Sequence, residues 1–339
     1  MEKGPRPMPP TPQSIDITVI GGGMYTREIV LPSVYELQRQ GLAGQIRVVG
    51  RTKSPLRALR DDPALCDAFP GHSFIAVPEP DDAAAVDDRD ANSDLYISVL
   101  DAMPAHQAVV VVLPDPMHYG AVKAALLRDQ HVLCVKPFTL SVAEAEELET
   151  MARERGLFIG IEYHKRFDRR SLIAKHDYRN GRFGEFVMGE AKMIEPYAYR
   201  FSNFQNWFTA ECSDPFVYVG CHYVDLACFI TGLAPVAVSV AGVKRPFPNG
   251  NDGYMWTHGR VHFENGAILS VINGLGYPDE GGGMNDQNLV MYCEGDGKTG
   301  VIEHDDQFRG VAYTTVDGDG PAYRYVNPDF FNYVDNDSR

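Results

Sequence analysis

The sequence predicts an α/β protein, in which a doubly wound parallel sheet in the N-terminal half is followed by an α+β domain with a large open, mostly antiparallel sheet. Three observations support this prediction. Between Ile15 and Glu162, short β-branched runs alternate with helical segments, which is typical of a parallel sheet covered by helices. A glycine-rich turn follows the first of these runs. From Tyr163 onward, alternating apolar and polar positions separated by hairpin turns replace this rhythm.

The strands predicted in the N-terminal half are short runs of apolar residues, and the run before Pro114 is too apolar for the edge of a sheet. They are residues 15–20, 46–49, 73–77, 106–113, 131–134 and 157–162. Helices are predicted at 24–40, at 121–127 and at 141–155, where Ser141 and Glu144 form a capping box. The acidic insert, residues 79–94, is predicted to be a solvated loop.

The C-terminal half combines two helices with a series of alternating strands. The helices are predicted around 169–178 and 221–231, and the strands at 259–263, 267–272, 289–293 and 300–303. Turn signals such as Asn265-Gly266 and Asp296-Gly297 separate the strands. We therefore divide the chain into a disordered tail (residues 1–14), a dinucleotide-binding domain (15–162) and a substrate-binding and oligomerisation domain (163–339).

The composition is that of a globular protein, with 44% hydrophobic and 23% charged residues and a formal net charge of −15. This charge argues against binding to nucleic acid or to an anionic membrane. No apolar run is long enough to span a bilayer, and the proline-rich first residues do not form a signal peptide, so we expect a cytoplasmic protein. The six cysteines show no metal-binding spacing, and we expect no metal site.

The first predicted strand ends in a turn of three glycines, which precedes a predicted helix. Such a strand–turn–helix lets backbone N–H groups approach a pyrophosphate at the positive end of the helix. The spacing departs from the usual dinucleotide-binding pattern because Thr26 stands where a third glycine is expected. We assign cofactor binding to Gly21, Gly23, Met24 and Tyr25.

The residues after the second predicted strand bear on the choice between NAD and NADP. An acidic residue at this place binds the ribose 2′-hydroxyl of NAD. Here Gly50 takes that place and is followed by Arg51 and Thr52, which can contact a 2′-phosphate. The predicted cofactor is therefore NAD or NADP, and Arg51 is the reason to favour NADP.

Two loops after later strands carry further candidates. Ligands bind at the carboxyl ends of parallel strands, so Pro114, His118 and Lys136 are predicted to face the cofactor. Lys136 directly follows a buried strand, and its amine can hydrogen-bond a substrate oxygen and stabilise charge that develops there. The alternatives are that His118 only begins a helix and that Lys136 extends from the strand end toward water.

Five short motifs, in their order along the chain, resemble the Gfo/Idh/MocA family from about Ile15 to at least Val301, together with a hairpin at 261–269. The motifs are the glycine-rich turn, Pro114 to His118, Lys136-Pro137, Gly160 to Phe167 and Gly220 to Asp225. The resemblance implies an N-terminal Rossmann domain and a C-terminal domain whose open sheet mediates homodimers or homotetramers. It also implies an enzyme that oxidises or reduces sugars, inositols or their derivatives with NAD(P).

The resemblance implies roles for three residues. Lys136 matches the lysine that hydrogen-bonds the reacting oxygen, and His222 matches the histidine that acts as acid or base. Asp225 matches an aspartate that assists it or stabilises its helix. The chain departs from the family pattern at Val135 in place of glutamate, Tyr218 in place of aspartate, Thr26 in place of glycine and Gly50 in place of an acidic residue.

The predicted reaction is hydride transfer between the nicotinamide and a secondary hydroxyl or keto group of a sugar, glycoside or cyclic polyol. His222 takes the proton, because an ordinary imidazole titrates near neutral pH, and Lys136 polarises the oxygen. Tyr218, four residues before His222, either shares the proton relay or packs as an aromatic side chain, and Arg166 equally fits a structural ion pair. The predicted substrate-binding residues are Tyr163, Lys165, Arg166, Trp207, His222 and Asp225.

Two other classes of protein remain open. One is a glycoside hydrolase that oxidises and re-reduces its sugar with a tightly held NAD, which the departures at Val135 and Tyr218 leave open. Release of free sugar without net formation of NADH distinguishes it from a dehydrogenase. The other is a non-catalytic dinucleotide-binding regulator, which would need neither Lys136 nor His222.

Overall fold

The computed structural model describes the chain except for residues 1–13, 86, 88, 90, 280–284, 296, 305–310, 318–319 and 327–339. The predicted tail, residues 1–14, therefore lies outside the described residues apart from Ser14. Contacts within the chain divide it into two units, and the division falls between Glu162 and Tyr163. Each unit has its own sheet and its own hydrophobic core.

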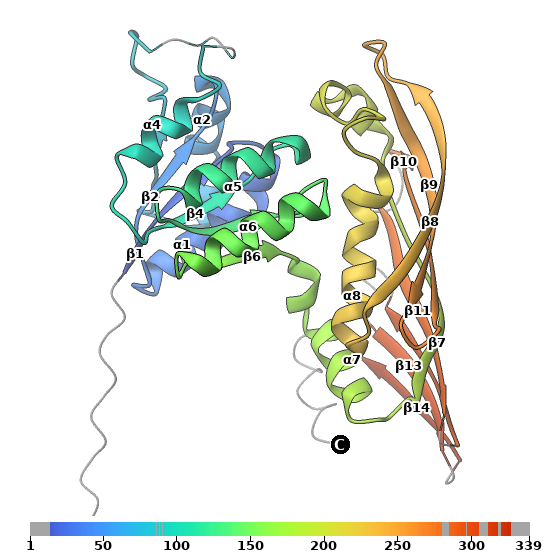
Figure 1. Cartoon of the computed structure of the whole chain (residues 1–339). Coiled ribbons are helices and arrows are strands. Elements are labelled where there is room, and N and C mark those ends of the chain that lie inside the picture. The colour runs from blue at the N-terminus through green and yellow to red at the C-terminus, as the bar shows by residue number, and fades with distance from the viewer. Residues whose placement is uncertain are drawn as a thin grey trace, which may run out of the picture. The chain divides into compact units, whose positions relative to one another are not determined.

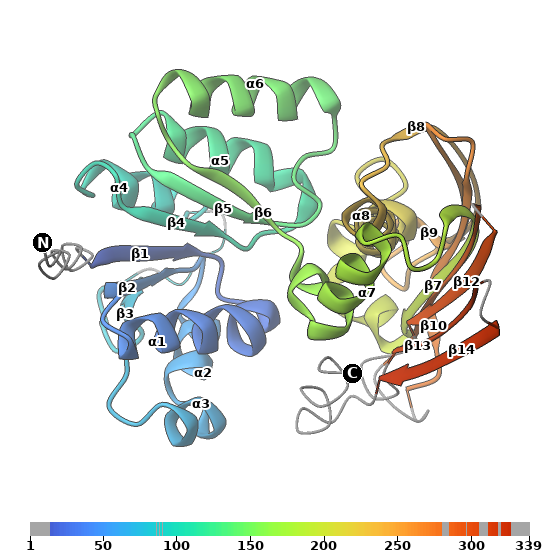
Figure 2. The same cartoon turned by 90° about the horizontal axis from the view of Figure 1, so that it is seen from below.

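The first unit contains a sheet of six parallel strands in the order β3-β2-β1-β4-β5-β6 (Figures 1 and 2). The strands are β1 (Ile15–Ile20), β2 (Ala43–Val49), β3 (Ile75–Val77), β4 (Ala108–Val111), β5 (His131–Val135) and β6 (Ile159–Glu162). This confirms the predicted doubly wound parallel sheet. The strand order reverses between β1 and β4, which is where such sheets bind ligands, at the carboxyl ends of the strands.

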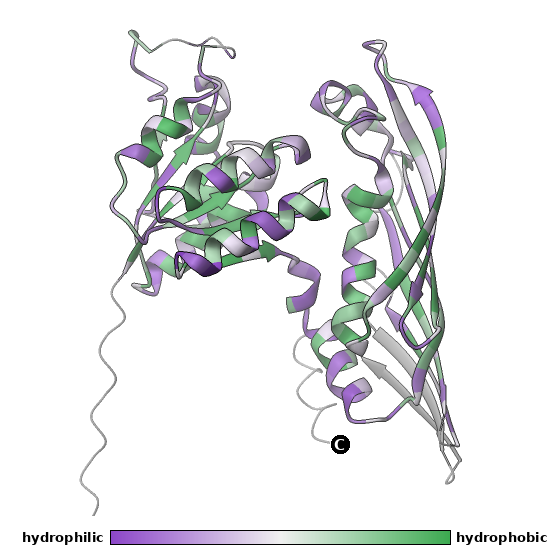
Figure 3. Ribbon diagram, viewed as in Figure 1, coloured by the Kyte–Doolittle hydropathy of each residue, from purple (hydrophilic) through white to green (hydrophobic). Residues whose placement is uncertain are grey.

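Helices cover both faces of this sheet, with α4, α5 and α6 on one face and α1, α2 and α3 on the other (Figure 2). Their bounds are α1 (Leu31–Arg39), α2 (Lys53–Arg60), α3 (Pro63–Ala68), α4 (Leu95–Asp101), α5 (His118–Leu126) and α6 (Val142–Glu154). The central strands are almost wholly apolar (Figure 3), and Val19 and Val111 are fully buried in the clusters on the two faces. Burial on both faces explains why these strands show no alternation in the sequence.

The helices of the first unit differ from the predictions at the start of the first helix and in α2, α3 and α4, none of which is among the predicted helices. The helix predicted at 24–40 begins with a π-helical turn (Thr26–Val30) before α1, and such turns are frequent at functional sites. Helix α4 is not among the predicted helices, because its sequence is rich in β-branched and aromatic residues. Its Leu100 is 1% exposed in the core, so packing overrides the weak propensity. The predicted N-cap at Ser141 is confirmed, since its hydroxyl accepts from the N–H of Glu144 at 3.2 Å.

The second unit contains an eight-stranded sheet in the order β14-β13-β12-β11-β7-β10-β9-β8. All neighbouring strands are antiparallel except β7 and β10, so the predicted open, mostly antiparallel sheet is confirmed. The strands are β7 (Glu185–Pro196), β8 (Pro235–Pro246), β9 (Asp252–Phe263), β10 (Ile268–Tyr277), β11 (Asp286–Gly295), β12 (Lys298–His304), β13 (Val311–Asp317) and β14 (Gly320–Val326). Gly266, with a φ of 88°, lies in the predicted turn between β9 and β10, whereas Asp296 lies outside the described residues.

Helices α7 (Arg169–Arg179) and α8 (Cys221–Thr231) lie on one face of this sheet (Figure 1). The core between them and the sheet includes Tyr223 and Leu226 of α8 and Phe186 and Leu269 of the strands, all 1% exposed or less. In the part of the chain that the structure describes, no helix covers the opposite face.

Within the described ranges, no helix is both long and apolar enough to cross a membrane. The residues that the structure describes also contain no group of histidine, cysteine and acidic side chains able to hold a metal ion. The six cysteines are free thiols. Burial raises the pKa of the Cys293 thiol to about 12, so this side chain is neutral and packs as a small apolar group.

Two glycines between α7 and β7 predict different costs of substitution. Gly181 and Gly184 have positive φ angles of 73° and 81°. A Cβ at Gly184 would lie 2.6 Å from the backbone carbonyl carbon of Glu294, whereas nothing lies within 4 Å of one at Gly181. We expect Gly181→Ala to lower the free energy of unfolding by about 1 kcal/mol and Gly184→Ala by about 3 kcal/mol or more, because backbone cannot move aside cheaply. Denaturant titration measures both losses, and equal values would contradict this steric argument.

Candidate active site

The glycine-rich turn after β1 has no room for a side chain at its first position. Gly21 has a φ of 119°, and a Cβ there would lie 1.9 Å from the carbonyl oxygen of Val112, which follows β4. Gly23 is exposed, and nothing lies within 4 Å of the place that a Cβ would take there. Thr26, in place of the third glycine, is buried, and its hydroxyl donates to the carbonyl oxygen of Gly21 at 2.7 Å. The turn thus presents bare backbone of the kind that binds a pyrophosphate, although one glycine is missing.

Tyr25 links the start of this helix to the last strand of the first sheet. Its hydroxyl donates to the carboxylate of Glu162 at 2.6 Å. Burial, together with this carboxylate, raises the pKa of Tyr25 well above its usual range, so the hydroxyl stays protonated. The neighbouring Met24 is 48% exposed. Contact of either side chain with the cofactor stays a prediction.

His118 joins the two loops that carry the other candidates of the first unit. Its Nδ1 lies 2.6 Å from the carbonyl oxygen of Pro137, and its Nε2 lies 2.7 Å from that of Leu113. The ring is fully buried. His118 therefore supports the loops after β4 and β5, and the predicted direct contact with the cofactor is not needed to explain its position.

Lys136 is the first residue after β5, and its side chain is only 8% exposed. It is joined to Pro137 by a cis peptide bond. Val135, where the family pattern has glutamate, is also buried. Since β4 and β5 are parallel neighbours, Lys136 and the loop that begins at Pro114 lie at the same edge of the sheet.

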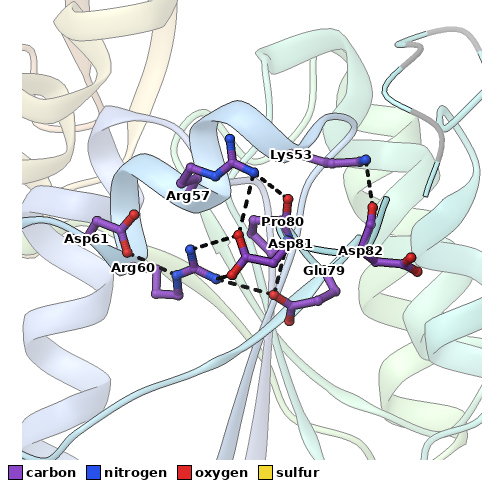
Figure 4. Close-up of polar contacts among 8 residues, drawn as sticks. All are labelled: Lys53, Arg57, Arg60, Asp61, Glu79, Pro80, Asp81 and Asp82. Atoms are coloured by element: carbon purple, nitrogen blue, oxygen red, sulfur yellow. Dashed lines mark hydrogen bonds and ion pairs between the residues drawn. The ribbon is translucent and has the colours of Figure 1, made fainter. Parts of the chain in front are cut away.

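The basic residues after β2 contact the acidic insert (Figure 4). The Lys53 ammonium donates to the carbonyl oxygen of Asp82 at 2.9 Å, and the Lys53 N–H donates to the carboxylate of Asp87 at 2.8 Å. The Arg51 guanidinium donates to the carbonyl oxygen of Arg89 at 3.2 Å. Thr52 is the N-cap residue of α2, with no side-chain cap hydrogen bond. Most of the described residues of the insert are exposed, as predicted, but the insert is anchored to the end of β2 and to α2.

In the second unit, His222 lies near the start of α8 and is 3% exposed. Its ring centroid lies 5.0 Å from that of His164 and 6.1 Å from that of Tyr163, in edge-to-face arrangements. Burial raises the pKa of Tyr163 well above its usual range, and Cys221 and Asp225 add to the effect. The structure thus brings the predicted acid–base residue together with two residues of the segment after β6.

Arg166 and Asp225 form a two-pronged ion pair. The Nε of Arg166 donates to the Asp225 carboxylate at 2.7 Å, and its Nη2 donates to the other carboxylate oxygen. The guanidinium also lies over the rings of Tyr163 and Phe229, at 5.4 and 5.5 Å from their centroids. The hydrogen bonds to Asp225 raise the pKa of Arg166. This geometry favours the structural alternative for Arg166, and substrate contact of either residue stays a prediction.

Gln287, at the start of β11, holds Lys165 and is not among the predicted site residues. Its Oε1 accepts from the Lys165 ammonium at 2.5 Å and from the Tyr223 hydroxyl at 3.1 Å, and its Nε2 donates to Asn285 at 3.1 Å. It is 6% exposed. In the sequence, Gln287 could have been noticed as a polar residue at an inward-facing position of a strand. Its contact with Lys165 can be seen only in the fold.

Tyr218 and Trp207 belong to an aromatic cluster. The Tyr218 ring lies 5.2 to 5.7 Å from the rings of Phe204, Trp207 and Phe208. Tyr218 is also part of a π-helical turn (Phe216–Gly220), which is wider than an α-helical turn and changes its angular relation to His222. These contacts favour the packing alternative for Tyr218.

A buried histidine of the second unit lies beside helix α7. His304, at the end of β12, is 4% exposed, and its Nε2 lies 3.4 Å from the hydroxyl of Ser171. Burial and the guanidinium of Arg170 lower the pKa of His304 to about 4. Its imidazole is therefore neutral at pH 7.

Two family models match successive parts of the chain. A model of an oxidoreductase family with an NAD-binding Rossmann fold matches residues 15–163. A model of the GFO/IDH/MocA C-terminal domain matches residues 172–295. The two matches follow the order of the two units.

Proteins similar in sequence include an uncharacterised oxidoreductase of Schizosaccharomyces pombe, which is 36% identical over 143 residues, 42% of this chain and 38% of that protein. UDP-N-acetylglucosamine 3-dehydrogenase of Acidithiobacillus ferrooxidans is 32% identical over 173 residues, 51% of this chain and 50% of that protein. The matched segment thus spans half or less of these relatives. Among solved structures, levoglucosan dehydrogenase in complex with NADH has a TM-score of 0.67 and 14% identity, covering 93% of this chain and 80% of that one, which shows a common fold.

The lowered pKa of His304 predicts a pH-dependent stability. An ordinary histidine titrates near pH 6.5, so between about pH 6.5 and about pH 4 the unfolded chain binds a proton that the folded protein excludes. The free energy of unfolding should therefore fall as the pH is lowered through this window, by about 1.4 kcal/mol per pH unit from this residue. Denaturant titrations at several pH values measure it. His304→Gln should show a shallower dependence, and equal slopes in both proteins would contradict the prediction.

Proposed function

Because the chain belongs to the GFO/IDH/MocA family of NAD(P)-dependent oxidoreductases, we propose that it transfers a hydride between a nicotinamide dinucleotide and a secondary hydroxyl or keto group of a sugar or cyclic polyol. The observation that carries this proposal is Lys136, a nearly buried amine at the carboxyl end of β5 in a dinucleotide-binding sheet. The names of two similar proteins, UDP-N-acetylglucosamine 3-dehydrogenase and levoglucosan dehydrogenase, support a carbohydrate as the substrate class.

The first unit fits the cofactor. The N–H of Gly21 donates to Val49, so the pyrophosphate is proposed to approach the turn around Gly23, where nothing lies within 4 Å of the place of a Cβ. The loop that begins at Pro114 follows the neighbouring strand β4, so it is the proposed support of the nicotinamide. The bound dinucleotide supplies the acceptor or donor of the hydride.

Lys136 is proposed to hydrogen-bond the reacting oxygen. Its side chain is largely removed from water, and a charged group acts more strongly on charge developing nearby in such surroundings. The ring of His118 contacts the carbonyl oxygens of both Leu113 and Pro137, so it connects the loop after β4 with the loop after β5. The amine is therefore presented by a fixed loop.

His222 is proposed to remove the hydroxyl proton in oxidation and to return it in reduction. An imidazole is suited to both steps because it titrates near neutral pH. The ion pair between Arg166 and Asp225 ties the helix of His222 to the turn that carries His164. Lys136 belongs to the first unit and His222 to the second.

Sugar hydroxyls are proposed to contact Tyr163 and Lys165, which flank His164. Tyr163 keeps its proton, so its hydroxyl both donates and accepts hydrogen bonds. The Lys165 ammonium is held by Gln287, beside the segment that carries Tyr163 and His164.

We also propose a homodimer or homotetramer formed through the helix-free face of the second sheet. Met188 and Tyr292 lie opposite each other on β7 and β11 and are 47% and 52% exposed. On the same face, the Trp256 ring lies over Gly274, where a Cβ would come within 2.3 Å of it. Exposed aromatic and methionine side chains on one face are typical of an interface.

The assigned roles predict that Lys136→Met and His222→Asn lose turnover while retaining cofactor binding. We expect kcat with a cyclic polyol or sugar to fall by about a hundredfold or more in each, since general acid–base or electrostatic assistance is removed. The dissociation constant of the dinucleotide should change by less than about threefold. Steady-state kinetics and calorimetric titration measure the two quantities.

His106→Asn serves as the control for His222→Asn. His106 precedes β4, at the edge of the sheet opposite the carboxyl ends, and has a φ of 61°, which asparagine tolerates. Its kcat should equal that of the wild type. Near-normal turnover in both site variants would refute the roles, and release of sugar from a glycoside without net NADH would favour the hydrolase alternative instead.

The proposed interface predicts that Tyr292→Lys produces a smaller species in sedimentation velocity than the wild type. A lysine ammonium on each copy would have to be desolvated in the contact. Val142→Lys is the matched control, because Val142 is 75% exposed in the first unit. A wild-type monomer, or an unchanged oligomer in Tyr292→Lys, would contradict the proposed interface.

A further inference from the structure

The end of β2 lies where a doubly wound sheet holds the adenosine ribose of its dinucleotide. In most such sheets an acidic residue in this position accepts from the ribose 2′-hydroxyl, and in this chain Gly50 occupies it. A Cβ at Gly50 would come within 3.2 Å of Leu56, so the site has little room for a side chain of its own. Any carboxylate at the ribose has to come from another segment.

The acidic insert brings a carboxylate to this place. Oδ1 of Asp87 accepts from the backbone N–H of Lys53, the first residue of α2, at 2.8 Å. This N–H is one of the unpaired donors at the positive end of the helix, and it is not capped by the side chain of Thr52. Asp87 therefore takes the backbone position that would otherwise attract an anion.

The cations that would serve a 2′-phosphate also contact the insert. The Lys53 ammonium donates to the carbonyl oxygen of Asp82 at 2.9 Å, and Arg51 donates to that of Arg89 at 3.2 Å. A phosphate that bound both side chains would have to share them with the insert. It would also approach an insert with seven acidic residues and one arginine in residues 79–94.

Further contacts anchor the insert along α2 (Figure 4). Arg57 donates to the carbonyl oxygen of Pro80 at 2.5 Å. Arg60 lies 2.8 Å from the carboxylate of Asp81 and 3.3 Å from that of Glu79. The hydrogen bond from Arg60 lowers the pKa of Asp81, so this carboxylate stays ionised. The segment that leads to Asp87 is therefore held at two successive turns of the helix.

We propose that the acidic insert makes this protein selective for NAD over NADP, with Asp87 as the residue that meets the adenosine ribose. The inference rests on the proposed function only in that a dinucleotide binds. A carboxylate has about four acceptor positions, so donation by the Lys53 N–H leaves capacity for a ribose hydroxyl. The same negative charge repels a 2′-phosphate. Under this proposal, the presence of Arg51 after β2 no longer favours NADP as the cofactor.

The test measures the dissociation constants of NAD and NADP by calorimetric titration of the full chain, with no substrate present. The wild type should bind NAD more tightly. Asp87→Asn should bind NADP about three- to tenfold more tightly than the wild type, because one charge facing the phosphate is removed, and NAD about two- to fivefold more weakly. Opposite changes for the two dinucleotides are the expected signature, since a merely structural role of Asp87 would weaken both.

Asp101→Asn is the matched control. Asp101 ends α4 and is paired with Arg128, and the following strand begins at Ala108, so this carboxylate lies toward the edge opposite the ribose. Removal of this charge should leave the ratio of the two constants unchanged. The wild-type preference should also shrink at high salt, because repulsion between exposed charges is screened.

Two outcomes separate the inference from the proposed function. Tighter binding of NADP than NAD by the wild type, or equal effects of Asp87→Asn on both, would overturn the role of the insert and leave hydride transfer untouched. Binding of neither dinucleotide by folded protein would overturn the proposed function itself.

Discussion

The first unit depends on the close approach of two backbones where β1 and β4 end. The N–H of Val112 donates to the carbonyl of Ile20 at 2.8 Å, and in the next residue the N–H of Gly21 turns to the carbonyl of Val49 on the other side at 2.8 Å. The carbonyl oxygen of Val112 occupies the place of a Cβ on Gly21. A side chain at Gly21 would separate the two strands at the point where the strand order reverses. The hydroxyl of Thr26, at the π-helical start of the following helix, donates to the carbonyl oxygen of the same glycine.

The second unit positions its polar side chains differently, through hydrogen bonds at the margin of an apolar layer. Arg166 and Asp225 use both prongs of one guanidinium, and Gln287 serves Lys165 and Tyr223 together. Buried polar groups are costly unless paired, so each arrangement is specific to one position of its partners. The apolar side chains of α8 pack in the core without fixing one orientation of the helix. The polar contacts at its margin therefore help to fix the position of His222.

Local patterns predicted most of the elements, whereas contacts between distant segments were beyond them. The bounds of α8 and the cap at Ser141 follow from neighbouring residues, and the structure has both. The hold of Gln287 on Lys165 joins residues 122 positions apart, and the contact of Asp87 with Lys53 joins residues 34 apart. Alternation tells which face a strand residue occupies but not which neighbour it meets. Arg51 illustrates the consequence, because its local sequence context suggests a phosphate ligand and its contact in the fold suggests otherwise.

This chain has a net charge of −15, which on average repels the phosphates of a dinucleotide. Groups that attract a phosphate therefore have to be placed locally, at the binding site. At the glycine turn, attraction comes from backbone N–H groups and the helix end, which carry partial charge without adding to the net charge. At the end of β2, the equivalent helix end is already occupied by the carboxylate of Asp87, and the nearby cations are engaged by the insert. Under the proposal above, the position of the pyrophosphate is favourable to an anion and the position of a 2′-phosphate is not. The proposed selectivity therefore depends on the distribution of charge around the sheet edge and not on the net charge of the chain.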